Sequence, residues 1–299
     1  MKRRETLQKT SIFLLLCVLV VVFVTPIFFV LMNSFKGRFF ISDQPFSLPR
    51  GELFAGLENY ARGIDRAGFF SAFVWSMFIT VISVLVIVLF TSMTALCITR
   101  VKTKSSEALY YAFVFSMVVP FQMIMFTMSK LADMLKLNNP LGMVVLYLGF
   151  GAGLSVFMFS GFVKGIPLEI EEAAMMDGCN PVKTYFRIVL PILKPTAITV
   201  AILNAMWIWN DYLLPYLVIG VGTPYKTIPV AVQYLMGSYG AKDYGALMAL
   251  LVLSIIPIII NPIGIIILIM SIINKKKYIT FSISGLVHIS ILSRPFIIL

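Results

Sequence analysis

Long apolar runs separated by short charged segments set the hydropathy pattern of this chain. No Asp, Glu, Lys or Arg occurs in five windows, which lie between Lys9 and Lys36, Arg66 and Arg100, Glu107 and Lys130, Lys136 and Lys164, and Asp243 and Lys275. Each window is long enough for a membrane-crossing helix, which needs about 20 apolar residues. A sixth run starts at Pro195 and continues past Asp211 into YLLPYLVIG. The pattern therefore predicts six transmembrane helices, over about 11–33, 69–99, 108–129, 141–163, 195–219 and 244–274.

Composition agrees with an all-α integral membrane protein. Of the 299 residues, 60% are hydrophobic and only 12% are charged, whereas a soluble domain is about 45–50% apolar. The run from Ser11 to Met32 is too long for the core of a cleaved signal peptide, so we expect it to be a retained anchor.

The positions of Lys and Arg predict the orientation. With residues 1–10 placed in the cytoplasm, the predicted cytoplasmic segments carry most of the 24 basic residues, as the positive-inside rule requires. Both termini are then cytoplasmic. The net charge of +11 fits a basic face against anionic membrane lipid and calls for no nucleic acid.

The sequence gives no pattern for chemistry within the chain. It contains no G-x-x-x-x-G-K-[ST] loop for cradling ATP phosphates. Its single histidine is His288, and the three cysteines, Cys17, Cys97 and Cys179, lie in separate segments. We expect no enzyme activity, no metal site and no cofactor in this chain.

The segment 165–191 is predicted to be a helix, a glycine turn and a second helix. Pro167 suits a first helical turn, and the acids that follow it lie near the positive end of the helix dipole. Gly178 is expected at the left-handed C′ position, and Asn180-Pro181 at the start of the second helix. In that helix one face is expected to hold Val182, Tyr185, Phe186 and Val189.

Two interpretations of this segment are open on these residues. A connector lying on the membrane surface explains the amphipathic second helix. It does not explain an acidic first helix with Ala173 and Ala174, because anionic headgroups repel acids. Docking on a cytoplasmic protein explains both helices.

The same segment resembles the EAA loop of permease subunits of bacterial ABC importers. Glu172-Ala173-Ala174, three residues, Gly178, nine residues and then Ile188-x-Leu190-Pro191 match EAA-x3-G-x9-I-x-LP at every fixed position. The resemblance implies the type I permease fold and a coupling helix that docks on an ATP-binding subunit. The residues it implies for coupling are Glu169, Glu172, Ala173, Ala174, Met176, Asp177, Gly178, Leu190 and Pro191.

Further motifs resemble the maltose and multiple-sugar type of permease, in particular its shorter, MalG-like subunit. They include Met117 to Gln122, Leu137 to Gly142, and Trp209 to Tyr212. The resemblance implies a subunit for di- and oligosaccharide uptake in a bacterial inner membrane. The implied partners are a second homologous permease, a homodimeric ATP-binding subunit that holds ATP and magnesium, and an extracytoplasmic sugar-binding protein.

Aromatic, amide and carboxylate groups that suit sugars gather near the outer end of the fifth predicted span. The candidate substrate-path residues there are Asn204, Trp207, Trp209, Asn210 and Asp211, and Gln122 in the third predicted span is a further candidate. An interfacial aromatic belt is an equally good interpretation of the tryptophans. Gln122 also fits an interhelical hydrogen bond.

Past Asn261 the resemblance ends, and residues 275–299 are expected to form an atypical tail. Other functions stay open on the sequence. They are a permease for glycerol phosphate or polyols, an ion-coupled secondary transporter, and a membrane scaffold.

Overall fold

The computed structural model describes residues 2–220, 222–235 and 243–256. All regular elements in these ranges are helical, and Lys36 and Phe54 form one isolated antiparallel bridge. The amino-terminal elements are α1 (Lys2–Ser34), α2 (Phe40–Asp43), the 3₁₀ turn η1 (Gly51–Leu53), α3 (Glu58–Ala67) and α4 (Phe69–Arg100). They are followed by α5 (Lys104–Ser116), α6 (Phe121–Met134), α7 (Pro140–Val163) and α8 (Leu168–Met176).

The carboxy-terminal part is more broken. Its elements are α9 (Pro181–Thr184), a π turn (Tyr185–Val189), α10 (Leu190–Ile192), α11 (Lys194–Asn210), α12 (Leu213–Pro215), a second π turn (Tyr216–Gly220), α13 (Ile228–Tyr234) and a last helix, Tyr244–Ile256.

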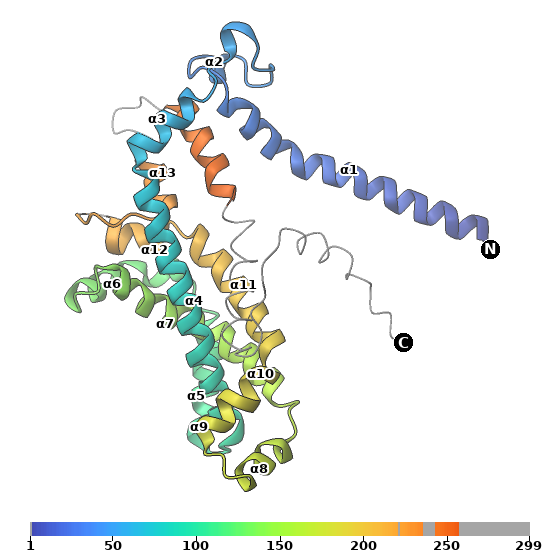
Figure 1. The fold of residues 1–299 in the computed structure, drawn as a ribbon, viewed down its shortest axis with the longest axis vertical. Coiled ribbons are helices and arrows are strands. Elements are labelled where there is room, and N and C mark those ends of the chain that lie inside the picture. Colours follow the sequence, from blue (N-terminus) through green and yellow to red (C-terminus); the bar gives the residue numbers. More distant parts are fainter. Residues whose placement is uncertain (1, 221, 236–242, 257–299) are drawn as a thin grey trace.

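The long helix α4 runs the length of the body, with α3 at one end and α8 at the other (Figure 1). Its inward face carries small polar residues, and its outward face carries large apolar ones. Ser76, Thr80, Ser83, Thr91 and Ser92 are buried, whereas Phe70, Val74, Phe90 and Met93 are exposed. Lipid is as apolar as a leucine side chain, so helices in a membrane associate through small and polar residues. The polarity of α4 is that of a helix with lipid outside.

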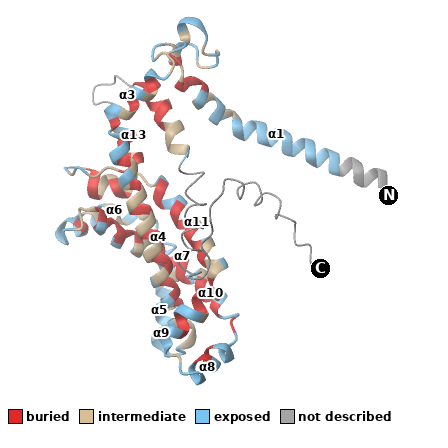
Figure 2. Cartoon of the chain, viewed as in Figure 1, coloured by how far each residue is buried: buried red, intermediate tan, exposed pale blue. Residues whose placement is uncertain are grey.

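The packing partner of α4 is α7, which is the most enclosed of the long helices (Figure 2). Glycines on α7 allow its neighbours to approach closely. A Cβ at Gly151 would lie 2.7 Å from Asn204 Oδ1 on α11, and one at Gly153 would lie 2.8 Å from the carbonyl oxygen of Phe113 on α5. Real Cβ atoms do not tolerate contacts this short. The close packing of α7 with α5 therefore requires a residue without a side chain at Gly153.

Three of the expected spans are single long helices. Lys9–Ser34, Phe69–Arg100 and Pro140–Val163 are long and apolar enough to cross a membrane. The expected span 108–129 is instead α5 and α6, bent by 106°. The bend follows from Pro120, which disfavours helical geometry at the residue before it.

The expected span 195–219 is also modified. Helix α11 ends at Asn210, and a 76° bend separates it from the preceding helix Pro181–Ile192. Pro191 and Pro195 account for this bend, because proline has no backbone N–H for the hydrogen bond of a continuous helix. The last expected span, 244–274, is described only as far as Ile256, and its remainder and the tail 275–299 lie outside the described residues.

Helix α1 stands away from the body (Figure 1). None of its most apolar window is buried against the described residues, and Figure 2 shows it exposed along its length from Lys9 almost to its end. An uncovered apolar helix of this length needs lipid or another protein around it.

The segment that joins α1 to α4 is held by a buried lysine and a buried asparagine. Lys36 Nζ donates to the carbonyl oxygens of Gln44 (2.7 Å) and Pro45 (3.1 Å), and burial lowers the pKa of Lys36. Asn59 Nδ2 donates to the carbonyl oxygens of Ser34 and Lys36. Arg66 on α3 pairs at 3.0 Å with Asp243, next to the last helix. The loop is therefore a folded cap on this end of the body.

The α7–α5 contact gives a direct test of the fold. We expect Gly153→Ala to lower the free energy of unfolding by about 1–3 kcal/mol, the usual cost of overpacking. The control is Gly149→Ala on the same helix, where a Cβ would meet nothing within 4 Å. Thermal unfolding of the purified protein in detergent measures both, and equal melting temperatures would show that α7 and α5 do not pack as described.

Candidate functional site

The predicted glycine turn after α8 is confirmed in detail. Gly178 has φ +81°, a conformation that costs glycine little and other residues more. Cys179 N–H donates to the Ala174 carbonyl, and Gly178 N–H donates to the Met175 carbonyl, both at 3.0 Å. This pair of bonds is the Schellman arrangement, which satisfies the last carbonyls of a helix.

The predicted start of the second helix is also confirmed. Asn180 Oδ1 accepts from Lys183 N–H at 2.8 Å, and Pro181 takes the first helical position. The helix that follows contains the π turn Tyr185–Val189.

The single apolar face expected for this helix is wrong. Tyr185 and Val189 are buried, but Val182 and Phe186 are exposed. Consecutive residues of a helix point about 100° apart, so Tyr185 and Val189 face the body while Val182 and Phe186 face away from it. Tyr185 uses its inward position to bond Ser92 on α4, with 2.7 Å between the two hydroxyl oxygens.

An ion pair attaches α8 to the end of α4. Arg100 donates from Nε (2.9 Å) and Nη2 (2.7 Å) to Glu171 Oε1. The same Nη2 donates to the Ile166 carbonyl at 2.9 Å. Glu171 is 7% exposed, so its carboxylate is largely removed from water and depends on this partner. Sequence reasoning did not select Glu171, because its partner lies 71 positions away and no local pattern links them.

The predicted coupling residues divide into two groups. Ala174 and Leu190 are buried and Pro191 is half-buried, so they pack within the chain. The others are exposed around the glycine turn: Glu169, Glu172, Ala173, Met176, Asp177 and Gly178. We call these six residues the loop tip.

The loop tip lies beside exposed apolar side chains. Met176 is 88% exposed, and Leu168, Met175, Val182 and Phe186 are exposed around it. Exposed large apolar side chains mark a contact with another protein or with a membrane. Both interpretations of this segment therefore stay open on its geometry.

The candidate substrate-path residues are also divided. Trp207, Asn210 and Gln122 are exposed. Trp209 is 3% exposed and packs edge-on against Phe73. Asn204 is buried and donates to Ser155 Oγ (3.1 Å) and to the Val200 carbonyl (2.8 Å). Trp209 and Asn204 therefore pack within the chain.

Asp211 lies where α11 ends, and its carboxylate is fully engaged. Tyr147 donates its hydroxyl to Asp211 Oδ2 at 3.0 Å, and Leu213 N–H donates to Oδ1 at 3.1 Å. Tyr147 in turn contacts the Trp207 ring edge-on. Asp211 therefore orients the outer end of α11 and the ring beside Trp207. In the described ranges, no three His, Cys, Asp or Glu side chains group closely enough to hold a metal ion.

Comparisons with known proteins agree with this geometry. The family described as "Binding-protein-dependent transport system inner membrane component" matches residues 87–276. The chain is 39% identical, over 86% of its length and 92% of the relative's, to the probable starch degradation products transport system permease protein AmyC of Thermoanaerobacterium thermosulfurigenes. It is 33% identical, over 87% and 93% of the two lengths, to the multiple sugar-binding transport system permease protein MsmG of Streptococcus mutans.

A solved structure shares the fold. A chain of a bacterial ABC transporter involved in the import of the acidic polysaccharide alginate superposes with a TM-score of 0.71. The match covers 88% of this chain and 96% of that one, at 20% sequence identity.

The contact between α4 and α8 can be tested by removing one charge. We expect Glu171→Ala to lower the free energy of unfolding by about 3 kcal/mol, the lower end for breaking a buried pair, because Arg100 keeps some contact with water. Glu172→Ala is the matched control, one position along and exposed, and should change stability little. Thermal unfolding measures both, and an equal loss in the two variants would contradict the proposed anchoring role.

Proposed function

The chain belongs to the family of inner membrane components of binding-protein-dependent transport systems, and on that premise we propose that it is the membrane-spanning subunit of an ATP-driven uptake system for di- and oligosaccharides. The substrate class is supported by the relatives, which are named for starch degradation products and for multiple sugars. The match extends over 92% and 93% of the lengths of those relatives.

The observation that carries the proposal is the anchored loop tip. We propose that it docks on a separate ATP-binding subunit, present in two copies, which holds ATP and magnesium. Arg100–Glu171 and Tyr185–Ser92 give α8 and the second helix two polar links to α4. Movement of the loop tip would then move α4 together with α7, and the cavity between the permeases would open alternately to the two sides.

A second, homologous permease completes the pathway in this proposal. It is supported by α1, whose apolar surface has no cover among the described residues. An extracytoplasmic sugar-binding protein is the third partner. We also propose six spans with both termini in the cytoplasm, from the apolar runs and the basic residues, and a bacterial inner membrane, from the family.

We propose that the exposed Trp207, Asn210 and Gln122 contact the sugar. Asp211 acts through Tyr147, which supports the Trp207 ring. Asn204 and Trp209 hold α11 against its neighbours. This division assigns recognition and packing to different residues of one helix.

The docking function predicts uncoupling at Gly178. In Gly178→Val the space is open, but a β-branched residue at φ +81° is strained, so the loop tip should change shape. We expect sugar uptake by the complete system to fall about tenfold relative to its ATP hydrolysis, equivalent to about 1.4 kcal/mol of coupling. Gly178→Asn is the control, because Asn tolerates left-handed geometry. Equal uptake per ATP in wild type and Gly178→Val would argue against the loop tip as the coupling element.

The two tryptophans of α11 give a matched pair. Trp207→Ala should raise the KM for sugar uptake without changing the melting temperature, since the ring is exposed. Trp209→Ala should lower the free energy of unfolding by about 3–5 kcal/mol, as expected for deleting a buried aromatic. Uptake kinetics and thermal unfolding on both variants separate the effects. A Trp207→Ala protein that transports with unchanged KM would remove Trp207 from the substrate path.

A further inference from the structure

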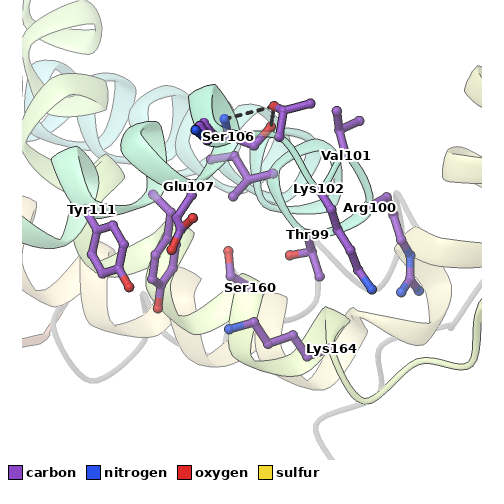
Figure 3. A pocket seen from close by; sticks show the side chains of 13 residues that line it. Thr99, Arg100, Val101, Lys102, Ser106, Glu107, Tyr111, Ser160 and Lys164 are labelled. Atoms are coloured by element: carbon purple, nitrogen blue, oxygen red, sulfur yellow. Dashed lines mark hydrogen bonds between the residues drawn. The ribbon is translucent and has the colours of Figure 1, made fainter.

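A pocket of about 600 Å³ lies beside the anchor of the loop tip. It is formed by the end of α4, the linker that follows, the first half of α5 and the end of α7. The side chains drawn in Figure 3 include Arg100 at the end of α4, Lys102 in the linker, Glu107 on α5, Ser160 on α7 and Lys164 directly after α7. Neither the sequence motifs nor the proposed function assigns a role to this pocket.

The pocket carries a positive charge that the chain leaves uncompensated. Arg100 is already paired with Glu171. Within the described ranges Lys102, Lys104 and Lys164 form no ion pair, and Lys164 lies over the Tyr110 ring at 5.3 Å. Glu107 is the single acid among the lining residues. Three lysines against one carboxylate favour an anionic occupant.

A buried hydroxyl in the pocket lacks a partner. Ser160 is 1% exposed, and its Oγ makes no hydrogen bond to any described residue. A buried polar atom of this kind costs free energy unless a ligand or water satisfies it. In Figure 3 the Ser160 side chain points into the space between the helices. A ligand with an acceptor oxygen at this point would satisfy it.

The start of α5 adds further attraction for an anion. Thr103 and Lys104 line the pocket, and α5 begins at Lys104. Free N–H groups and the dipole at a helix start favour phosphate oxygens. Thr103 Oγ1 caps only one of these groups, Ser106 N–H, at 3.2 Å.

We propose that this pocket binds a phosphate group, supplied by the headgroup of an anionic phospholipid. The pocket lies at the ends of the long apolar helices α4 and α7, where headgroups meet protein. On α5 next to it, Tyr111 and Phe115 are exposed and give acyl chains an apolar surface. Basic pockets between membrane helices on the cytoplasmic side bind such headgroups. The placement of the pocket on the cytoplasmic side rests on the proposed function, whereas the argument that the pocket binds a phosphate group does not.

The proposal gives lipid composition a route to coupling. The bound phosphate would contact the segment that carries Arg100, whose guanidinium also holds Glu171 and the Ile166 carbonyl. Occupancy would strengthen the link between α8 and α4, through which movement of the loop tip reaches the body.

Lipid binding by the complete transport complex tests this inference. The complex is placed in phosphatidylcholine nanodiscs with increasing phosphatidylglycerol, and retained phosphatidylglycerol is counted by native mass spectrometry. The test variant carries Lys102→Gln, Lys104→Gln and Lys164→Gln. The control carries Arg50→Gln, Lys130→Gln and Lys136→Gln, which remove the same charge from exposed positions outside the pocket.

We expect wild type and control to retain one more phosphatidylglycerol per copy than the test variant, which should need about tenfold more lipid for the same occupancy. Ser160→Ala keeps every charge and should still weaken retention several-fold, and it replaces the test variant if that protein fails to assemble. If millimolar inorganic phosphate displaces the lipid, the phosphate group in the pocket comes from free phosphate and not from a lipid headgroup. Equal retention by wild type and by both pocket variants would overturn the proposal, even in a complex that imports sugar normally.

Discussion

The ion pair between Arg100 and Glu171 connects α8, which carries the exposed loop tip, with the long helix α4, whose outer side can contact lipid. Arg100 ends the longest helix of the body, and Glu171 lies in the first turns of α8, 2.7 Å away. Glu171 is shielded from water and Arg100 is partly exposed, so the buried carboxylate depends on the hydrogen bonds from Arg100. Without it α8 would be a nine-residue helix, too short to be stable alone. The exposed loop tip is therefore held in position by a contact behind it.

The rigidity of that contact depends on how α4 is packed. In a membrane no hydrophobic driving force presses helices together, and close approach replaces it. The glycines of α7 permit this approach, and two hydroxyls on the inner face of α4 are satisfied by carbonyls one turn back on α4 itself. Thr91 and Ser92 donate to the carbonyls of Ile87 and Val88. A push on Glu171 is thus transmitted to a packed pair of helices and not to a flexible hairpin.

Local features of the loop could be predicted from the sequence, and long-range features could not. Gly178 and Asn180-Pro181 act through their own backbone geometry, so the turn and the helix start were correct. The single apolar face predicted for the second helix was wrong, because helical spacing shows which residues share a side but not how much of that side packs against the body. The Arg100–Glu171 pair was missed since neither residue has a sequence neighbour that points to the other. Pro120 was visible in the sequence. The span over 108–129 was nevertheless predicted from hydropathy alone, which does not detect a bend.

The same difference between local and long-range features explains why only some of the candidate substrate-path residues on α11 are exposed. Trp207 and Trp209 look alike in sequence, yet two positions along a helix turn one ring outward and the other into the core. Composition identifies groups that suit sugars, whereas the helix decides which of them a sugar can reach. Asp211 illustrates the consequence: its carboxylate ends α11, receives the Tyr147 hydroxyl and so places an aromatic ring beside Trp207. By holding Tyr147 in place, Asp211 determines the shape of the surface around Trp207.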